Sequence, residues 1–253
     1  MLKEFFRNIR LPQSIFFIIL VLTGVMVSGF YQMHSIIMKI LLIFFLWEYT
    51  VVINRIYDER KYEKLHYSAS LAFLSTSLIL GLVLGPVFLA LGMTYIIAGT
   101  VYSTPPLRLR KYMFGTAFIG IGSVIAFLIG YYENPSTPLT YEILNYCILL
   151  FLATSLGSTI KDMKDYEKDR KDGIKNIFTV FGLEKGKKIS SALLLVTFLI
   201  PSLVFNLPID ISFFVIMGVL SVAVFIKFED FRPVMFLAFL VLLYCVLRLK
   251  GIV

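Results

Sequence analysis

The chain has 253 residues, of which 58% are hydrophobic and 16% charged, and its mean hydropathy is +0.86. A soluble domain of this length does not need so much apolar surface, so the composition excludes an ordinary globular protein and indicates a polytopic membrane protein. We expect the net charge of +8 to follow from membrane topology, and no nucleic-acid partner is predicted.

Nine apolar stretches approach the length of about 20 residues that crosses a hydrocarbon core of about 30 Å as a helix. Long uninterrupted runs suit helices better than barrel strands. Gly85-Pro86 divides the stretch from 67 to 102 into two spans, because proline breaks or kinks a helix. The sequence predicts an all-α bundle in a single domain, residues 1–253. The predicted spans are 12–30, 35–53, 67–84, 86–102, 113–131, 141–160, 189–206, 210–226 and 233–249.

The distribution of basic residues predicts the orientation of this bundle. With the amino terminus in the cytoplasm, all of the 24 Lys and Arg residues except Lys39, Arg248 and Lys250 fall on the cytoplasmic side. Because cytoplasmic loops carry an excess of Lys and Arg, this pattern favours nine spans in a cell membrane with an inward amino terminus. We treat the span after "MLKEFFRNIR" as a mature helix rather than a signal peptide.

The first polar cluster follows the second predicted span. In "WEYTVVINRIYDERKYEK", Asn54 and Asp58 are one helical turn apart, and Glu59 and Glu63 come next. Glu48 lies within the same span, where an acid usually faces a cavity or a partner. We interpret Glu48 as the acceptor of a hydrogen bond from a neighbouring helix, or alternatively as a group that binds an acceptor substrate or transfers a proton.

Two further polar segments lie on the same predicted side. "YSTPPLRLRKY", residues 102 to 112, places Arg108 and Arg110 beside two prolines, and arginine suits bidentate phosphate recognition. "KDMKDYEKDRKDG", residues 161 to 173, has aspartates at spacings that would place them on one face of a helix. They are Asp162, Asp165, Asp169 and Asp172. A solvated helix whose lysines and arginines neutralise these acids pairwise is the alternative interpretation.

Carboxylate and amide oxygens are suitable ligands for Mg²⁺, which often binds one or two carboxylates together with substrate phosphates. If the acidic clusters face one another, the three segments predict a site for a metal-bound phosphate or diphosphate.

In their order and placement, the three segments resemble the motifs of the UbiA superfamily of intramembrane prenyltransferases. "NRIYDERKY" matches the family's first motif at Asn54 and Asp58, and the second motif matches at Lys161, Asp162, Asp165, Asp169 and Gly173. "YSTPPLRLRKY" resembles the Tyr-Ser element after helix four, which begins here at Tyr102.

This resemblance implies nine transmembrane helices and transfer of an isoprenyl group from a polyprenyl diphosphate to a lipophilic acceptor. The aspartates Asp162, Asp165 and Asp169 would hold one Mg²⁺, and Asn54 and Asp58 would form a weaker second site. The catalytic residues would be Asp58, Asp165 and Asp169. The diphosphate would contact Lys161, Arg108, Arg110, Arg55 and Tyr102.

The chain departs from the family pattern in its first motif, because Arg55 and Tyr62 stand where aspartates are usual. A fixed cation at Arg55 would replace part of the charge of the second Mg²⁺. A relative that binds prenyl diphosphate or lipid without turnover is the alternative, and a transporter is disfavoured because the acids gather at one membrane face. The acceptor predicted is geranylgeranylglyceryl phosphate, in ether-lipid synthesis, or an aromatic ring, in quinone synthesis.

Overall fold

The computed structural model describes residues 11–58, 64–134 and 136–252, without the side chains of residues 11, 12, 58 and 64. These described residues are all-helical, as predicted. Eight helices are long and apolar enough to cross a membrane, and one shorter apolar helix, Gln13–Ser28, precedes them. The amino-terminal "MLKEFFRNIR" and the residues Glu59, Tyr62 and Glu63 lie outside the described residues.

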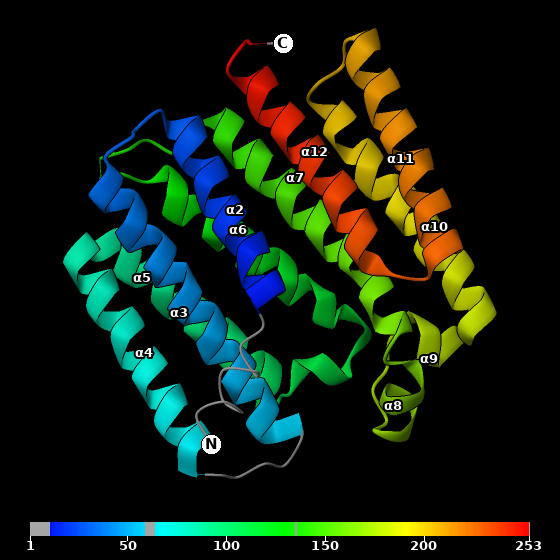
Figure 1. Cartoon of the computed structure of the whole chain (residues 1–253), viewed down its shortest axis with the longest axis horizontal. Coiled ribbons are helices and arrows are strands. Elements are labelled where there is room, and N and C mark those ends of the chain that lie inside the picture. The colour runs from blue at the N-terminus through cyan, green and yellow to red at the C-terminus, as the bar shows by residue number, and fades with distance from the viewer. Residues whose placement is uncertain (1–10, 59–63, 135, 253) are drawn as a thin grey trace. The chain divides into compact units, whose positions relative to one another are not determined.

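The chain divides into two compact units, and the first comprises Met1–Arg108 and Ile121–Pro138. Its central helix is α3, which packs against α2, α4 and α5 (Figure 1). Most of α6 also belongs to this unit. The helices are α2 (Leu11–Ser28), α3 (Met33–Asp58), α4 (Lys64–Leu84), α5 (Pro86–Ser103) and α6 (Ala117–Tyr131).

The second unit comprises Leu109–Gly120 and Leu139–Val253. Within it α10 packs against α7, α9 and α11, and α11 packs against α12. The two short helices α8 and α9 lie together at one end of the long helices (Figure 1). The elements are η1 (Leu109–Lys111), η2 (Met113–Thr116), α7 (Tyr141–Gly157), η3 (Ser158–Met163), α8 (Tyr166–Lys171), α9 (Ile177–Phe181), α10 (Leu183–Leu199), η4 (Ile200–Leu203), α11 (Pro208–Phe228) and α12 (Phe231–Leu249).

The boundaries of the helices agree with the predicted spans at most positions. The predicted hairpin at Gly85-Pro86 is confirmed: α4 ends at Leu84, α5 begins at Pro86, and Gly85 between them has φ 119°. Such a positive φ is accessible to glycine because it lacks Cβ. The seventh span begins earlier than expected, at Leu183 instead of residue 189, because its first turn is polar and escapes a search for apolar runs.

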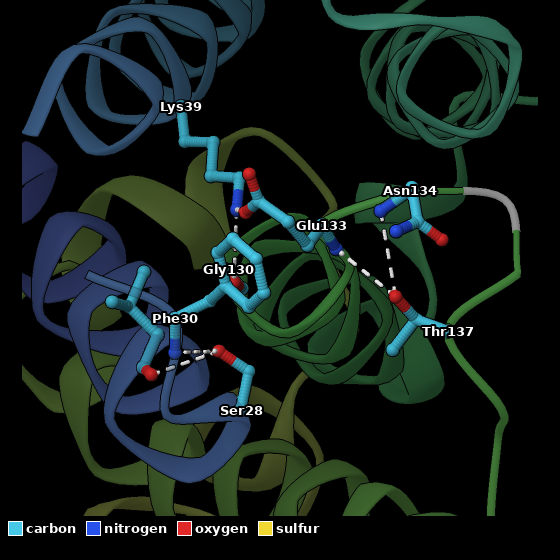
Figure 2. A network of polar contacts seen from close by, with 8 residues as sticks. Ser28, Phe30, Lys39, Gly130, Glu133, Asn134 and Thr137 are labelled. Atoms are coloured by element: carbon cyan, nitrogen blue, oxygen red, sulfur yellow. Dashed lines mark hydrogen bonds and ion pairs between the residues drawn. The ribbon is translucent and has the colours of Figure 1, made fainter. Parts of the chain in front are cut away.

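Charged residues inside the first unit are paired. Lys39 is 1% exposed, and its Nζ lies 2.9 Å from Oε2 of Glu133 and 3.4 Å from the carbonyl oxygen of Gly130 (Figure 2). The ammonium also lies 5.6 Å from the ring centroid of Phe88. A buried ammonium without such partners would cost several kcal/mol of desolvation.

Two other buried acids have close partners. Glu48 accepts a hydrogen bond of 2.9 Å from Oγ of Ser14 on α2, which agrees with the interpretation of this residue as a contact between helices. In the second unit Asp210 is fully buried and accepts hydrogen bonds from Tyr244 and Arg248, both on α12. Each of these contacts joins two helices of the same unit.

Two glycines permit the close approach of α2 and α6. A Cβ on Gly130 would lie 1.9 Å from the carbonyl oxygen of Val21, and a Cβ on Gly24 would lie 2.1 Å from that of Phe127. Both clashes are with backbone atoms, which no side-chain rotation relieves. Small residues are typical where membrane helices pack backbone to backbone.

We therefore expect Gly130→Ala to destabilise the first unit by about 1–3 kcal/mol, since the added methyl group has to push the two helices apart. Thermal unfolding of the purified protein in detergent measures this. Gly92→Ala is the matched control on α5, because a Cβ there has only the side chain of Leu46 at 3.9 Å. Equal losses of thermal stability in the two variants would contradict the prediction.

Candidate metal and diphosphate site

The aspartate-rich segment is not one continuous helix, so the expectation of four aspartates on a single helical face is wrong. Asp162 lies in η3, Asp165 precedes the first residue of α8, Asp169 lies within α8, and Asp172 follows its last residue. The tighter winding of η3 and the turn at Lys164–Asp165 change the direction of successive side chains. As a result the four aspartates have different environments: Asp169 is buried, Asp162 is intermediate, and Asp165 and Asp172 are exposed.

Asp169 has the most unusual environment of these residues. Its Oδ2 accepts a hydrogen bond of 2.8 Å from Nδ2 of Asn176. Its Oδ1 is buried and accepts no hydrogen bond from the described residues, and the closest guanidinium nitrogen of Arg110 is 3.9 Å away. Burial raises the pKa of Asp169 to about 6, and the charge of Arg110 opposes this rise. A buried carboxylate oxygen without a donor fits a position for a cation.

Asn176 was missed by the sequence analysis. It is buried and precedes α9, where its Oδ1 accepts a hydrogen bond of 2.9 Å from the amide of Thr179. The hydroxyl of Thr179 in turn accepts one of 2.8 Å from the amide of Asn176, which completes a capping box. The pattern Asn-Ile-Phe-Thr was the available signal, since a polar residue followed three positions later by a reciprocating side chain marks the start of a helix.

The lysines of the segment do not simply neutralise its aspartates. Lys164 lies 2.9 Å from Asp230, which caps α12 through the amide of Arg232. Hydrogen bonds from Arg232 and Lys164 hold the pKa of Asp230 well below its usual range. Lys161 is half-exposed, and its Nζ is 4.0 Å from Oδ1 of Asp162. The alternative of pairwise neutralisation therefore does not describe Lys164, although it lies between Asp162 and Asp165.

The predicted diphosphate-binding segment contributes to both units. In the second unit, the amide of Lys175 donates a hydrogen bond of 3.0 Å to the carbonyl oxygen of Lys111, which joins η1 to the segment between α8 and α9. This bond lies next to Arg110, the residue that approaches Asp169. The structure thus brings together Arg110 and the pair Asp169 and Asn176 from two separate parts of the sequence.

The other predicted site residues belong to the first unit. Asn54 and Arg55 lie in the last turns of α3, both partly buried, and Asp58 is the last residue of this helix. Nη2 of Arg108 lies 3.4 Å from the carbonyl oxygen of Tyr57, at the same helix end. A cation is favourable there because the carbonyl groups of a helix end carry partial negative charge. Tyr102 lies in the last turn of α5 and is partly buried.

Within the described parts of the chain, no three His, Cys, Asp or Glu side chains are close enough together to hold a metal ion. Mg²⁺ commonly takes one or two carboxylates and completes its octahedron with water and substrate phosphate oxygens. The arrangement of Asp169 fits a ligand of this kind. That Asp162, Asp165 and Asp169 share one ion stays a prediction.

Comparisons with known proteins identify the family. The model of the UbiA prenyltransferase family matches residues 63–234. A search of curated proteins gives no match. Several solved structures share the fold over almost the whole chain.

A UbiA homologue from Archaeoglobus fulgidus is 18% identical with a TM-score of 0.72, covering 98% of each chain. One from Aeropyrum pernix K1 is 15% identical with a TM-score of 0.64, covering 96% of this chain and 97% of that one. A digeranylgeranylglyceryl phosphate synthase is 19% identical with a TM-score of 0.62, covering 98% and 96%. The Archaeoglobus homologue has also been solved with GPP and Mg²⁺ and with DMAPP and Mg²⁺.

The family model spans more than half of the chain and the fold agrees, so the protein belongs to the UbiA prenyltransferase family.

Proposed function

We propose that the protein transfers an isoprenyl group from a polyprenyl diphosphate to a lipophilic acceptor in a magnesium-dependent reaction. The observation that carries this proposal is Oδ1 of Asp169, which is buried, accepts no hydrogen bond from the described residues and lies 3.9 Å from Arg110. An unsatisfied buried acceptor costs about 1–3 kcal/mol, and more when it is charged. A hard cation bound at this oxygen would remove that cost.

The residues proposed for each role follow from this assignment. We assign a Mg²⁺ to Asp169 on its geometry, and propose Asp162 and Asp165 as further ligands on the basis of the sequence, since the three carboxylates do not converge on one point in the described residues. Asn54 and Asp58 are proposed to hold a weaker second ion. Magnesium, when bound, supplies positive charge that stabilises the diphosphate leaving group. The membership of the family and the GPP and DMAPP complexes of the Archaeoglobus homologue support a prenyl diphosphate as donor. The residues proposed to contact the diphosphate are Lys161, Arg108, Arg110, Arg55 and Tyr102.

Arg110 has a defined part in this scheme. Its guanidinium lies beside Asp169, and the backbone bond between Lys175 and Lys111 fixes the adjacent residue. A planar guanidinium can donate two parallel hydrogen bonds to phosphate oxygens. We therefore assign Arg110 to the diphosphate oxygens next to the metal, where it stabilises charge that appears as the carbon–oxygen bond breaks.

The acceptor and the location are proposed on the basis of the sequence. Geranylgeranylglyceryl phosphate, in ether-lipid synthesis, is the first acceptor to test, and an aromatic ring, in quinone synthesis, is the second. The aspartate-rich segments would face the cytoplasm, because most Lys and Arg residues fall on that side of the eight long apolar helices and their shorter neighbour.

A second candidate function is binding of a prenyl diphosphate without turnover. Arg55 favours it, because this residue stands at a position where the family's first motif has an aspartate. Arginine cannot ligate a metal ion, so the second Mg²⁺ would have one ligand fewer at this position. The first of the two experiments below separates this candidate from the transferase.

The first experiment supplies the purified protein with geranylgeranyl diphosphate, Mg²⁺ and a mixture of both acceptor classes. Pyrophosphate release and mass spectrometry of the products are measured. We expect a prenylated product, and a loss of at least about 100-fold in rate for Asp169→Asn and Asp165→Asn, since even partners of metal ligands contribute 10–100-fold. Asp172→Asn is the control from the same segment, exposed at the end of α8, and should retain the rate.

An unchanged rate in Asp169→Asn would contradict the assignment of this carboxylate. Magnesium-dependent binding of the diphosphate without any pyrophosphate release would instead support the binding protein. The mass of the prenylated product shows which of the two acceptor classes the protein uses.

The second experiment tests Arg55 as a substitute for part of the charge of a second metal ion. We expect the wild-type rate to rise with the first power of Mg²⁺ concentration. In Arg55→Asp the reaction should require a higher Mg²⁺ concentration, and its rate should rise nearly with the square of that concentration, because a carboxylate then replaces the fixed cation. Arg55→Gln, which removes the cation without adding a ligand, should lower the rate while keeping the first-power dependence. A wild-type rate that rises with the square of the Mg²⁺ concentration would reject this role for Arg55.

A further inference from the structure

The two oxygens of Asp169 have different surroundings. Asp169 is 4% exposed and Asn176 is 6% exposed, and the amide Nδ2 of Asn176 donates to Oδ2 of Asp169 at 2.8 Å. Oδ1, in contrast, accepts no hydrogen bond from the described residues. Oδ1 is therefore the oxygen of this carboxylate whose two lone-pair sites both lack a hydrogen bond from the described residues.

The direction of the Asn176 amide is determined by its second contact. Its Oδ1 accepts the amide hydrogen of Thr179, a contact that only the oxygen side of the amide group can make. The planar amide then has its Nδ2 on the side of Asp169. One side chain thus caps α9 and holds Oδ2 of Asp169, and turning the amide over would break both hydrogen bonds.

The backbone around this pair closes a small loop. The amide of Ile174 donates to the carbonyl oxygen of Asp169 at 2.9 Å, and Gly173 between α8 and Ile174 has φ +68°. The hydroxyl of Thr179 donates to the carbonyl oxygen of Ile174 at 2.7 Å. The distance between Asp169 and Asn176 is therefore set by a hydrogen-bonded turn rather than by one side-chain contact.

We propose that Asn176 is a positioning residue, which holds Oδ2 of Asp169 so that Oδ1 is presented to a divalent cation. This inference rests on the proposed function, because it assigns a role within the same site. An amide suits the role better than Lys or Arg. It orients the carboxylate with a neutral donor and leaves the negative charge undiminished for the metal.

Two substitutions of Asn176 separate positioning from helix capping. Asn176→Ser keeps an oxygen that can cap α9 but is too short to hold Asp169, whereas Asn176→Ala loses both functions. We expect both variants to bind Mg²⁺ about 10–100-fold more weakly than the wild type. Thermal stability should fall further in Asn176→Ala than in Asn176→Ser. The measurements are calorimetric titrations with Mg²⁺ in detergent, with geranylgeranyl diphosphate present and the acceptor omitted, and thermal unfolding of each variant.

Thr179→Ala is the matched control, because it removes the hydroxyl that contacts Asn176 and Ile174. The backbone amide of residue 179 still holds Oδ1 of Asn176, and the backbone bond from Ile174 to Asp169 still closes the turn, so Nδ2 of Asn176 stays beside Asp169. We expect Thr179→Ala to lose thermal stability and to keep the wild-type affinity for Mg²⁺. Recovery of Mg²⁺ affinity in Asn176→Ser, or an equal loss in Thr179→Ala, would show that Asn176 acts only through the helix and would overturn the inference.

The failure of this inference is distinguishable from that of the proposed function. If the wild type binds Mg²⁺ with geranylgeranyl diphosphate and both Asn176 variants bind it equally well, the positioning role alone is rejected. If the wild type binds no Mg²⁺ under these conditions, the proposed function and the positioning role are both rejected.

Discussion

The structure depends on the requirement that polar groups in the hydrocarbon region find partners within the protein, because lipid offers none. Lys39 meets this requirement through Glu133, Glu48 through Ser14, and Asp210 through Tyr244 and Arg248. Lys39 joins α3 to the end of α6 and the loop that follows it, and the other two contacts each join two helices, each contact within one unit. The polar residues that are most costly to bury therefore also specify which helices pack together.

Asp169 lies outside the long apolar helices and differs from these buried charged residues. Its surroundings are defined by several contacts: the capped helix α9, the hydrogen-bonded turn between α8 and α9, and the buried side-chain amide of Asn176. Nevertheless one oxygen is left without a hydrogen bond from the described residues. This arrangement is the observation on which the proposed cation site depends.

The sequence was sufficient to predict the all-helical class, most helix boundaries and the hairpin at Gly85, because long apolar runs and a Gly-Pro break have few alternative structures. It did not predict the break between η3 and α8, since a spacing of three or four residues suits a helix and does not reveal a local change in winding. Asn176 escaped detection because its contact with Asp169 depends on how the intervening turn closes. The metal ligands and the role of Arg55 stay predictions.

The hydrogen bond between the amide of Lys175 and the carbonyl oxygen of Lys111 has a mechanical consequence for the second unit. It ties the segment that carries Arg110 to the one that carries Asn176, while Asn176 is itself joined to Asp169. A displacement of one of these segments would therefore carry the other with it, so Arg110, Asp169 and Asn176 would keep their spacing when this end of the unit moves.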